Sequence, residues 1–203
     1  MIILHANGSC SLGILQLVEE AELEYKIKSV DLAGGEQRTE AFLAVNPKGK
    51  VPALILDSGA LLTEWPAIAT YIAAQDSTGR LIPEDPLSKA RVYEAVDYIV
   101  STVHMQGFTR MVRPGNFTPG EKDHDAVKAR GRAIFDGGLA VMDEALGARD
   151  YVVDQFSIAD AALFYCENWK VNRLGETLPP RLEAHFNRML ARPATVRAIA
   201  RSS

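Results

Sequence analysis

The sequence has little cysteine, no long apolar run and no concentration of positive charge. Cys10 and Cys166 are the only cysteines among 203 residues, too few for a disulfide framework, so we expect free thiols. Every uninterrupted apolar run falls well short of the roughly 18 residues of a membrane span, and the N-terminus lacks the basic and apolar regions of a signal peptide. We therefore expect a cytoplasmic protein with no membrane partner.

Several ligand-binding motifs are also missing. The sequence contains no C-x-x-C, no H-E-x-x-H, no phosphate loop and no G-x-G-x-x-G. Its net charge is −4, and no block of Lys and Arg is interleaved with aromatic residues. We therefore expect neither a metal nor a nucleic-acid partner. With 47% hydrophobic and 24% charged residues, the chain has the composition of a globular protein with one or two ordinary domains.

The first 76 residues predict a mixed four-stranded sheet with helices. A short apolar run at 2–4 and a half-alternating run at 25–30 indicate two strands, and residues 11–21 between them repeat apolar side chains at helical spacing. Because a helix joins these two strands, we expect them to be parallel. Residues 54–62 contain a hairpin around an Asp-Ser-Gly turn, and a further helix begins at Glu64.

Residues 46–54, Asn-Pro-Lys-Gly-Lys-Val-Pro-Ala-Leu, are the most informative stretch. Pro52 directly precedes an apolar run that is typical of a buried strand. A proline has no amide to donate to a ladder, so we place it at the first position of the third strand, where a cis bond would expose the preceding backbone. Val51 would then offer its N–H and C=O to an extended peptide. The alternative is a turn with nothing bound.

The rest of the chain is helical in pattern. Residues 77–86 separate charges with glycine and proline and indicate a linker between a domain at 1–76 and an all-helical domain at 87–203. We expect long helices over 87–112 and 121–146, then a third that begins at a Ser-x-x-Asp cap formed by Ser157 and Asp160. Prolines bracket two shorter helices near the C-terminus. The predicted fold class is therefore α+β.

This order of features resembles the cytosolic glutathione S-transferases along the whole chain. The resemblance is carried by residues 46–54, by the Leu-Thr-Glu entry to a helix at 62–64 and by Phe-Ser-Ile-Ala-Asp at 156–160. Gly-Ser-Cys-Ser-Leu at 8–12 is most similar to the bacterial beta class, which has a cysteine where other classes use tyrosine or serine. The resemblance implies a thioredoxin-like N-terminal domain with a cis proline before strand three. It also implies a homodimer that acts in detoxification and transfers its co-substrate, reduced glutathione, to a small hydrophobic electrophile.

Three neighbouring residues are the main catalytic candidates. Cys10 lies at a predicted helix N-terminus, where unpaired N–H groups and the helix dipole can lower the pKa of a thiol. Taken by itself it is equally a small buried hydrophobe; the resemblance implies that its thiolate contacts the glutathione sulfur. Ser11 would donate its hydroxyl to the same sulfur, and Ser9 would assist, or else either serine simply caps the helix.

The resemblance also implies a set of glutathione-binding residues. Val51 and Pro52 would form the edge along which the peptide lies. Lys50 either reaches the glycyl carboxylate or stays in solvent. Glu64 would receive the γ-glutamyl carboxylate at its backbone N–H, while its own carboxylate faces the ligand's ammonium; the alternative is an ordinary first-turn acid.

A further group lies on the first long helix. The resemblance implies that His104 approaches the sulfur or the acceptor, although the following segment 105–108 carries one residue more than the class usually has. Ser101 and Asp97 lie one and two turns earlier on the same face, and Asp97 would extend toward glutathione, either within the chain or across a dimer. A hydrophobic acceptor pocket would draw on Tyr98, His104, Phe108 and Met111.

Two departures from the family pattern leave other functions open. Trp65 stands where most relatives have a serine that binds the γ-glutamyl carboxylate, and this chain has Gly34-Gly35-Glu36 where the class often has a lysine after the second strand. If the indole points away from the pocket, glutathione binding survives; if it points inward, the site is closed. The alternatives are therefore glutathione-dependent thiol–disulfide exchange through Cys10, or a non-catalytic binding or assembly module on the same fold.

Overall fold

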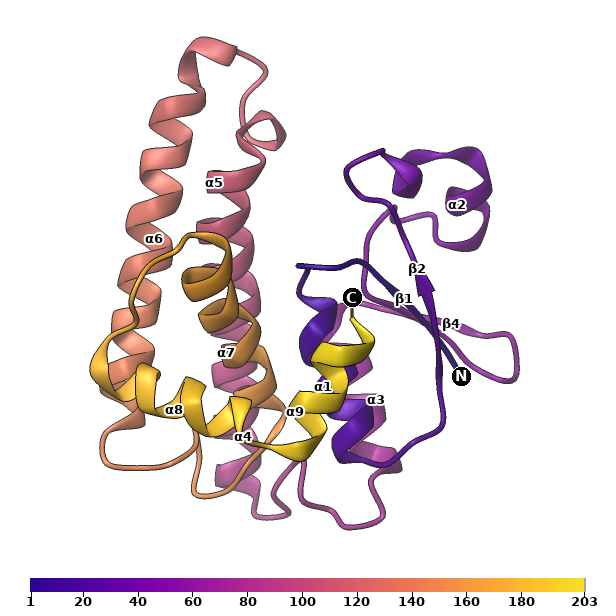
Figure 1. Cartoon of the computed structure of the whole chain (residues 1–203), viewed down its shortest axis with the longest axis vertical. Coiled ribbons are helices and arrows are strands. Elements are labelled where there is room, and N and C mark those ends of the chain that lie inside the picture. The colour runs from indigo at the N-terminus through magenta and orange to yellow at the C-terminus, as the bar shows by residue number, and fades with distance from the viewer. Residues whose placement is uncertain (203) are drawn as a thin grey trace. The chain divides into compact units, whose positions relative to one another are not determined.

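The computed structural model describes residues 1–202 and divides into two compact units (Figure 1). The first comprises Met1–Glu84 together with the chain from Arg188 onward. The second is Asp85–Asn187. Each unit has its own layers and its own core, so each is described separately.

The first unit is built on a mixed four-stranded sheet in the order β2-β1-β3-β4. The strands are β1 (Ile2–His5), β2 (Lys26–Ser29), β3 (Ala53–Ile55) and β4 (Leu61–Thr63). β1 pairs with β2 in parallel, as predicted from the helix that joins them, whereas β1 with β3 and β3 with β4 are antiparallel. Ile3 lies opposite Ile27 on one side and Leu54 on the other, so the apolar run at the N-terminus forms the centre of the sheet.

Helices complete this unit. They are α1 (Ser11–Glu20), η1 (Glu36–Arg38), α2 (Glu40–Val45), α3 (Trp65–Gln75) and α9 (Pro193–Arg201). α1 is buried over almost its whole length and packs against α3 and α9 (Figure 1). A thioredoxin-like sheet flanked by helices, with a helical second unit, confirms the predicted fold class.

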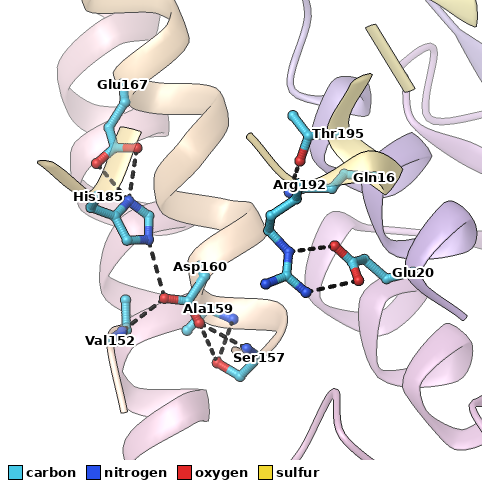
Figure 2. Close-up of polar contacts among 10 residues, drawn as sticks. All are labelled: Gln16, Glu20, Val152, Ser157, Ala159, Asp160, Glu167, His185, Arg192 and Thr195. Carbon is cyan, nitrogen blue, oxygen red and sulfur yellow. Dashed lines mark hydrogen bonds and ion pairs between the residues drawn. The ribbon is translucent and has the colours of Figure 1, made fainter. Parts of the chain in front are cut away.

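The C-terminal helix α9 belongs with the first unit because polar and ionic contacts hold it on α1 (Figure 2). Gln16 Nε2 donates to Thr195 Oγ1 at 2.6 Å. Arg192 donates from two guanidinium nitrogens to the carboxylate of Glu20, at 2.6 and 2.9 Å. The predicted domains, 1–76 and 87–203, follow sequence order and therefore place α9 in the second domain. These limits stay a proposal.

All described elements of the second unit are helical. They are α4 (Pro86–Asp97), η2 (Tyr98–Phe108), α5 (Thr109–Val112), η3 (Pro114–Asn116), η4 (Glu121–Asp123), α6 (His124–Leu146), α7 (Ile158–Asn168), η5 (Trp169–Arg173) and α8 (Pro180–Leu190), the last of which runs on into the segment assigned to the first unit. α4, η2 and α5 follow one another without a break, as predicted for 87–112. Within residues 1–202, no helix combines the length and apolar character that crossing a bilayer requires.

The middle of this long helix is a π-helix that packs closely on α6. A π-helix closes its hydrogen bonds over one residue more than an α-helix. Gly107 faces α6 at this level. A Cβ placed there would lie 2.9 Å from the backbone of Phe135, so only glycine lets the two helices approach this closely.

The second unit also contains a buried charged cluster (Figure 2). Asp160 accepts the backbone N–H of Ser157 at 2.8 Å and that of Val152 at 2.7 Å, which confirms the predicted cap and its structural role. His185 bridges Asp160 and Glu167, with its ring nitrogens 3.2 and 2.9 Å from their oxygens. Burial lowers the pKa of His185, but the two carboxylates more than offset burial and raise it to about 10, so α7 and α8 are joined by an imidazolium.

Candidate functional site

The loop between β1 and α1 carries Cys10, whose thiol is buried. Cys10 is the N-cap of α1, is 7% exposed and has its Sγ 3.9 Å from the backbone oxygen of Val51. Burial raises the pKa of this thiol to about 12, and a backbone hydrogen bond opposes burial only in part. The lowering expected from the helix N-terminus is therefore outweighed, because the thiolate would lose its solvation. In this structure Cys10 is a neutral thiol that faces the Val51 backbone.

Two serines flank Cys10 and are hydrogen-bonded to each other. The Oγ atoms of Ser9 and Ser11 lie 2.5 Å apart. Ser11 is fully buried, with its Oγ 2.7 Å from Nδ1 of His5, whereas Ser9 is half-buried. His5 in turn lies 3.3 Å, through Nε2, from the backbone oxygen of Ser202. No role for His5 was predicted from the sequence; its place at the end of β1, next to the loop, was the available signal.

The stretch before β3 has the predicted backbone. The Val51–Pro52 bond is cis, and Val51 lies outside the strand that begins at Ala53. Asn46 Nδ2 donates to the carbonyl of Lys50 at 2.8 Å, which fixes the preceding turn. The side chain of Lys50 is exposed. The Val51 backbone therefore lies beside the Cys10 loop, on a segment held in shape by its own side chains.

Glu64 begins α3 in an unusual conformation. It is the N-cap of α3, with φ +70° and ψ 125°, a region that a residue other than glycine adopts at a cost of about 1–3 kcal/mol and that is concentrated at ligand sites. Its exposed carboxylate is 2.9 Å from Nζ of Lys48. Lys48 was not among the residues predicted from the sequence; its signal was its position two residues before Lys50 in the same turn.

Trp65 is turned into the protein. The side chain is 3% exposed, and Nε1 donates to the carbonyl of Cys10 at 3.0 Å. The same carbonyl accepts the N–H of Gly13 at 3.2 Å. The indole thus joins the start of α3 to the start of α1, and its effect on glutathione binding stays a prediction.

His104 lies in an aromatic cluster of the second unit. Its Nδ1 is 3.3 Å from the hydroxyl of Tyr165, and its ring meets that of Trp169 edge-on with centroids 4.8 Å apart. Phe108 is buried and stacks on Trp169 at 4.2 Å. The ring of Phe108 is therefore part of this core, and the expectation that it lines an acceptor pocket stays a prediction.

The other candidates on the long helix are exposed. Ser101 donates its hydroxyl to the carbonyl of Asp97, one turn earlier, at 2.6 Å, and both side chains face solvent. Their roles, like that of His104, stay predictions. Within residues 1–202 no group of three or more His, Cys, Asp and Glu side chains is arranged to hold a metal ion.

The sheet order, the cis proline and the helical second unit together define a thioredoxin-like domain with an appended helical domain. The family model "Glutathione S-transferase, N-terminal domain" matches residues 8–75. Glutathione S-transferase GstA of Escherichia coli O157:H7 is 35% identical to this chain, over 95% of the chain and 94% of GstA. The chain belongs to the glutathione S-transferase family.

Two solved structures are similar over their whole length. A sphingomonad glutathione S-transferase complexed with glutathione has a TM-score of 0.85 at 34% identity, covering 100% of this chain and 98% of that one. The bacterial beta class glutathione S-transferase of Sphingomonas chungbukensis has a TM-score of 0.85 at 33% identity, covering 100% and 99%.

Proposed function

We propose that the protein is a beta-class glutathione transferase that binds reduced glutathione on its first unit and transfers it to a small hydrophobic electrophile. The observation that carries the proposal is the convergence, around one loop, of the Val51 backbone, the Cys10 thiol and the Ser9 and Ser11 hydroxyls. The cysteine in that loop and the likeness to a beta-class structure support the class. A homodimer in the cytoplasm is part of the same proposal.

Each part of the peptide has a matching group on this unit. The N–H and C=O of Val51 would pair with the extended backbone of glutathione. The γ-glutamyl carboxylate would lie at the N-terminus of α3, where helix N–H groups have no acceptor within the helix. Glu64 would face the ammonium group, exchanging its contact with Lys48 for one with the ligand, and Lys50 would reach toward the glycyl carboxylate.

The chemistry would be nucleophilic attack by sulfur. Glutathione loses its thiol proton, its sulfur forms a bond to the electrophilic carbon, and the leaving group departs with its electron pair. A thiolate needs hydrogen-bond donors in a site that excludes water. Ser9 supplies a hydroxyl group, Ser11 holds that group in place through the 2.5 Å contact between their Oγ atoms, and the neutral Cys10 thiol supplies a weak donor at the same place.

Exchange through Cys10 is the less favoured reaction. It would require the Cys10 thiolate as nucleophile, and the raised pKa of this thiol, about 12, leaves very little thiolate near neutral pH. A non-catalytic module is the alternative that Trp65 suggested. Burial of the indole and its hydrogen bond to the Cys10 carbonyl support an orientation that leaves the γ-glutamyl site open, and therefore favour the transferase.

The test is initial-rate conjugation of glutathione to chlorodinitrobenzene by wild type, Glu64→Gln and Glu94→Gln. Glu94 is the matched control, an exposed acid that pairs with Arg91 on the second unit. We expect Glu64→Gln to raise KM for glutathione by about tenfold or more, the worth of a hydrogen bond to a charged group, and Glu94→Gln to leave it unchanged. No conjugation by wild type, or equal effects of both variants, would contradict the proposal.

A further inference from the structure

A chain of hydrogen bonds leads from the half-buried surface of the site into the core of the first unit. It joins Ser9 Oγ to Ser11 Oγ at 2.5 Å, Ser11 Oγ to His5 Nδ1 at 2.7 Å, and His5 Nε2 to the Ser202 carbonyl at 3.3 Å. His5 and Ser11 are each at most 1% exposed. A buried polar chain of this kind either fixes the loop or moves a proton.

The donor and the acceptor of each hydrogen bond in this series follow from its last member, the Ser202 carbonyl. The Ser202 carbonyl can only accept, so Nε2 of His5 carries a proton, and in a neutral imidazole Nδ1 is then an acceptor. The Ser11 hydroxyl has two acceptors within reach, His5 Nδ1 at 2.7 Å and the Ala6 carbonyl at 3.4 Å. The shorter contact assigns its proton to His5, and its oxygen accepts from Ala6 N–H at 3.3 Å and from the Ser9 hydroxyl. The oxygen of Ser9 accepts Ser11 N–H at 3.2 Å and keeps a second lone pair.

The proton affinity of the chain increases toward its inner end, because imidazole is a far stronger base than a hydroxyl. Burial lowers the pKa of His5, and the Ser202 carbonyl offsets burial only in part, so the ring is neutral before glutathione binds. Burial also disfavours the imidazolium, so the transfer depends on the negative charge that develops on the glutathione sulfur to stabilise the proton on His5. The nearby Cys10 thiol is kept protonated by its raised pKa, about 12. It therefore does not compete with His5 for a proton.

We propose that Ser9, Ser11 and His5 form a relay that removes the proton from the thiol of bound glutathione and stores it on Nδ1 of His5. The inference rests on the proposed function. The S–H bond breaks and sulfur keeps the electron pair; Ser9 Oγ gains that proton as its own passes to Ser11 Oγ, and the Ser11 proton passes to Nδ1. Both hydroxyls are regenerated, with Ser9 now donating to the thiolate, and the imidazolium is held by Ser11 Oγ and the Ser202 carbonyl.

The test compares His5→Phe with His5→Asn, using Thr195→Val as the matched control. Asparagine keeps an acceptor near the position of Nδ1 but is not basic. Thr195→Val also removes a buried hydrogen bond from the first unit, the one with Gln16. For each variant the ultraviolet absorbance of the bound thiolate, followed over pH, gives the pKa of the glutathione thiol, and calorimetry gives the affinity for glutathione.

We expect both His5 variants to raise the bound thiol pKa by about one unit or more and to lower kcat/KM by about a hundredfold, the lower end of the range for general base catalysis. Glutathione affinity should change far less, and Thr195→Val should change neither the thiol pKa nor kcat/KM. A normal thiol pKa in His5→Asn would overturn the relay, because an acceptor that only orients Ser11 would then suffice. Absence of glutathione binding in wild type would instead refute the proposed function.

The wild-type protein provides a second test that does not depend on the folding of a variant. The chain has four histidines, so the ring nitrogens of His5 can be assigned by nitrogen NMR. On addition of glutathione, Nδ1 of His5 should change from unprotonated to protonated as the thiolate band appears. A thiolate complex in which His5 remains neutral would overturn the proposal.

Discussion

Replacing Trp65 tests whether the indole is part of the core and not of a ligand pocket. Its side chain is 3% exposed, and its Nε1 donates a hydrogen bond to the Cys10 carbonyl. Loss of a buried large aromatic ring costs about 3–5 kcal/mol. The hydrogen bond adds only about 1 kcal/mol, because the Cys10 carbonyl keeps its second donor, the N–H of Gly13. Burial of the ring therefore contributes more to stability than the hydrogen bond does.

Two variants separate the ring from the hydrogen bond. Trp65→Ser removes both, and we expect it to lower the free energy of unfolding by about 3–5 kcal/mol. Trp65→Phe keeps most of the ring and should cost about 1–2 kcal/mol, the hydrogen bond plus imperfect packing. Urea unfolding followed by circular dichroism gives both values, provided that the slope of the transition is the same as in wild type.

The comparison can refute the reasoning directly. If Trp65→Ser unfolds within about 0.5 kcal/mol of wild type, the effect expected of a surface position, the indole is not buried against α1. If the serine and phenylalanine variants lose equal stability, the hydrogen bond contributes more than the ring. Either result would reopen the interpretation in which the indole occupies the γ-glutamyl site.

Three further predictions concern the packing and charges around the two cores. The pKa of His185 is raised from 6.5 to about 10, so its contribution to stability is complete below about pH 6.5 and is lost as pH rises to 10. Thermal unfolding of wild type should show this decline, and that of His185→Gln should lack it. An unchanged decline in the variant would contradict the charged state of His185. The same variant leaves Asp160 and Glu167 buried without their cation, so its free energy of unfolding at neutral pH should be about 3–5 kcal/mol lower than that of wild type. Gly107→Ala forces a Cβ to 2.9 Å from the Phe135 backbone and should lower the free energy of unfolding by about 1–3 kcal/mol. Its control, Gly137→Ala, places a Cβ with nothing within 4 Å and should stabilise α6 by about 0.5–1 kcal/mol. Equal urea midpoints for the two variants would refute the close approach of the helices at Gly107. Arg192→Met removes the two-pronged contact with Glu20 and should cost about 1–2 kcal/mol in urea unfolding. Its matched control, Arg91→Met, removes an exposed i,i+3 pair with Glu94 and should have little effect; parity between the two variants would contradict the anchoring of α9.

Local patterns in the sequence predicted the local structure well. Pro52 ahead of an apolar run predicted the start of a strand, and β3 begins at the next residue, Ala53. The cis bond between Val51 and Pro52, which the family resemblance implied, is also present. Ser157 and Asp160 predicted a capping box, and both of its hydrogen bonds form. In each case the residues that interact are within a few positions of one another, so their spacing alone limits the geometry.

Contacts between distant segments could not be predicted in this way. Gln16 and Thr195 are 179 positions apart, and nothing in their local sequence couples them. The helix dipole at Cys10 is a local effect and predicted a lowered pKa, whereas the pKa is raised by burial, to which segments distant in sequence, such as the one that carries Val51, contribute. His5 had no interpretable pattern because β1 is buried on nearly every residue, without alternation.

The most direct test of the central claim is calorimetric titration of the wild-type protein with reduced glutathione and, in parallel, with cysteinylglycine, which lacks the γ-glutamyl group. The claim is that the Val51 backbone and the N-terminus of α3, begun by Glu64, form one peptide site. It predicts saturable binding of glutathione at one site per chain, and binding of the dipeptide that is weaker by tenfold or more, about 1.4 kcal/mol. No binding of glutathione, or equal binding of both peptides, would contradict it.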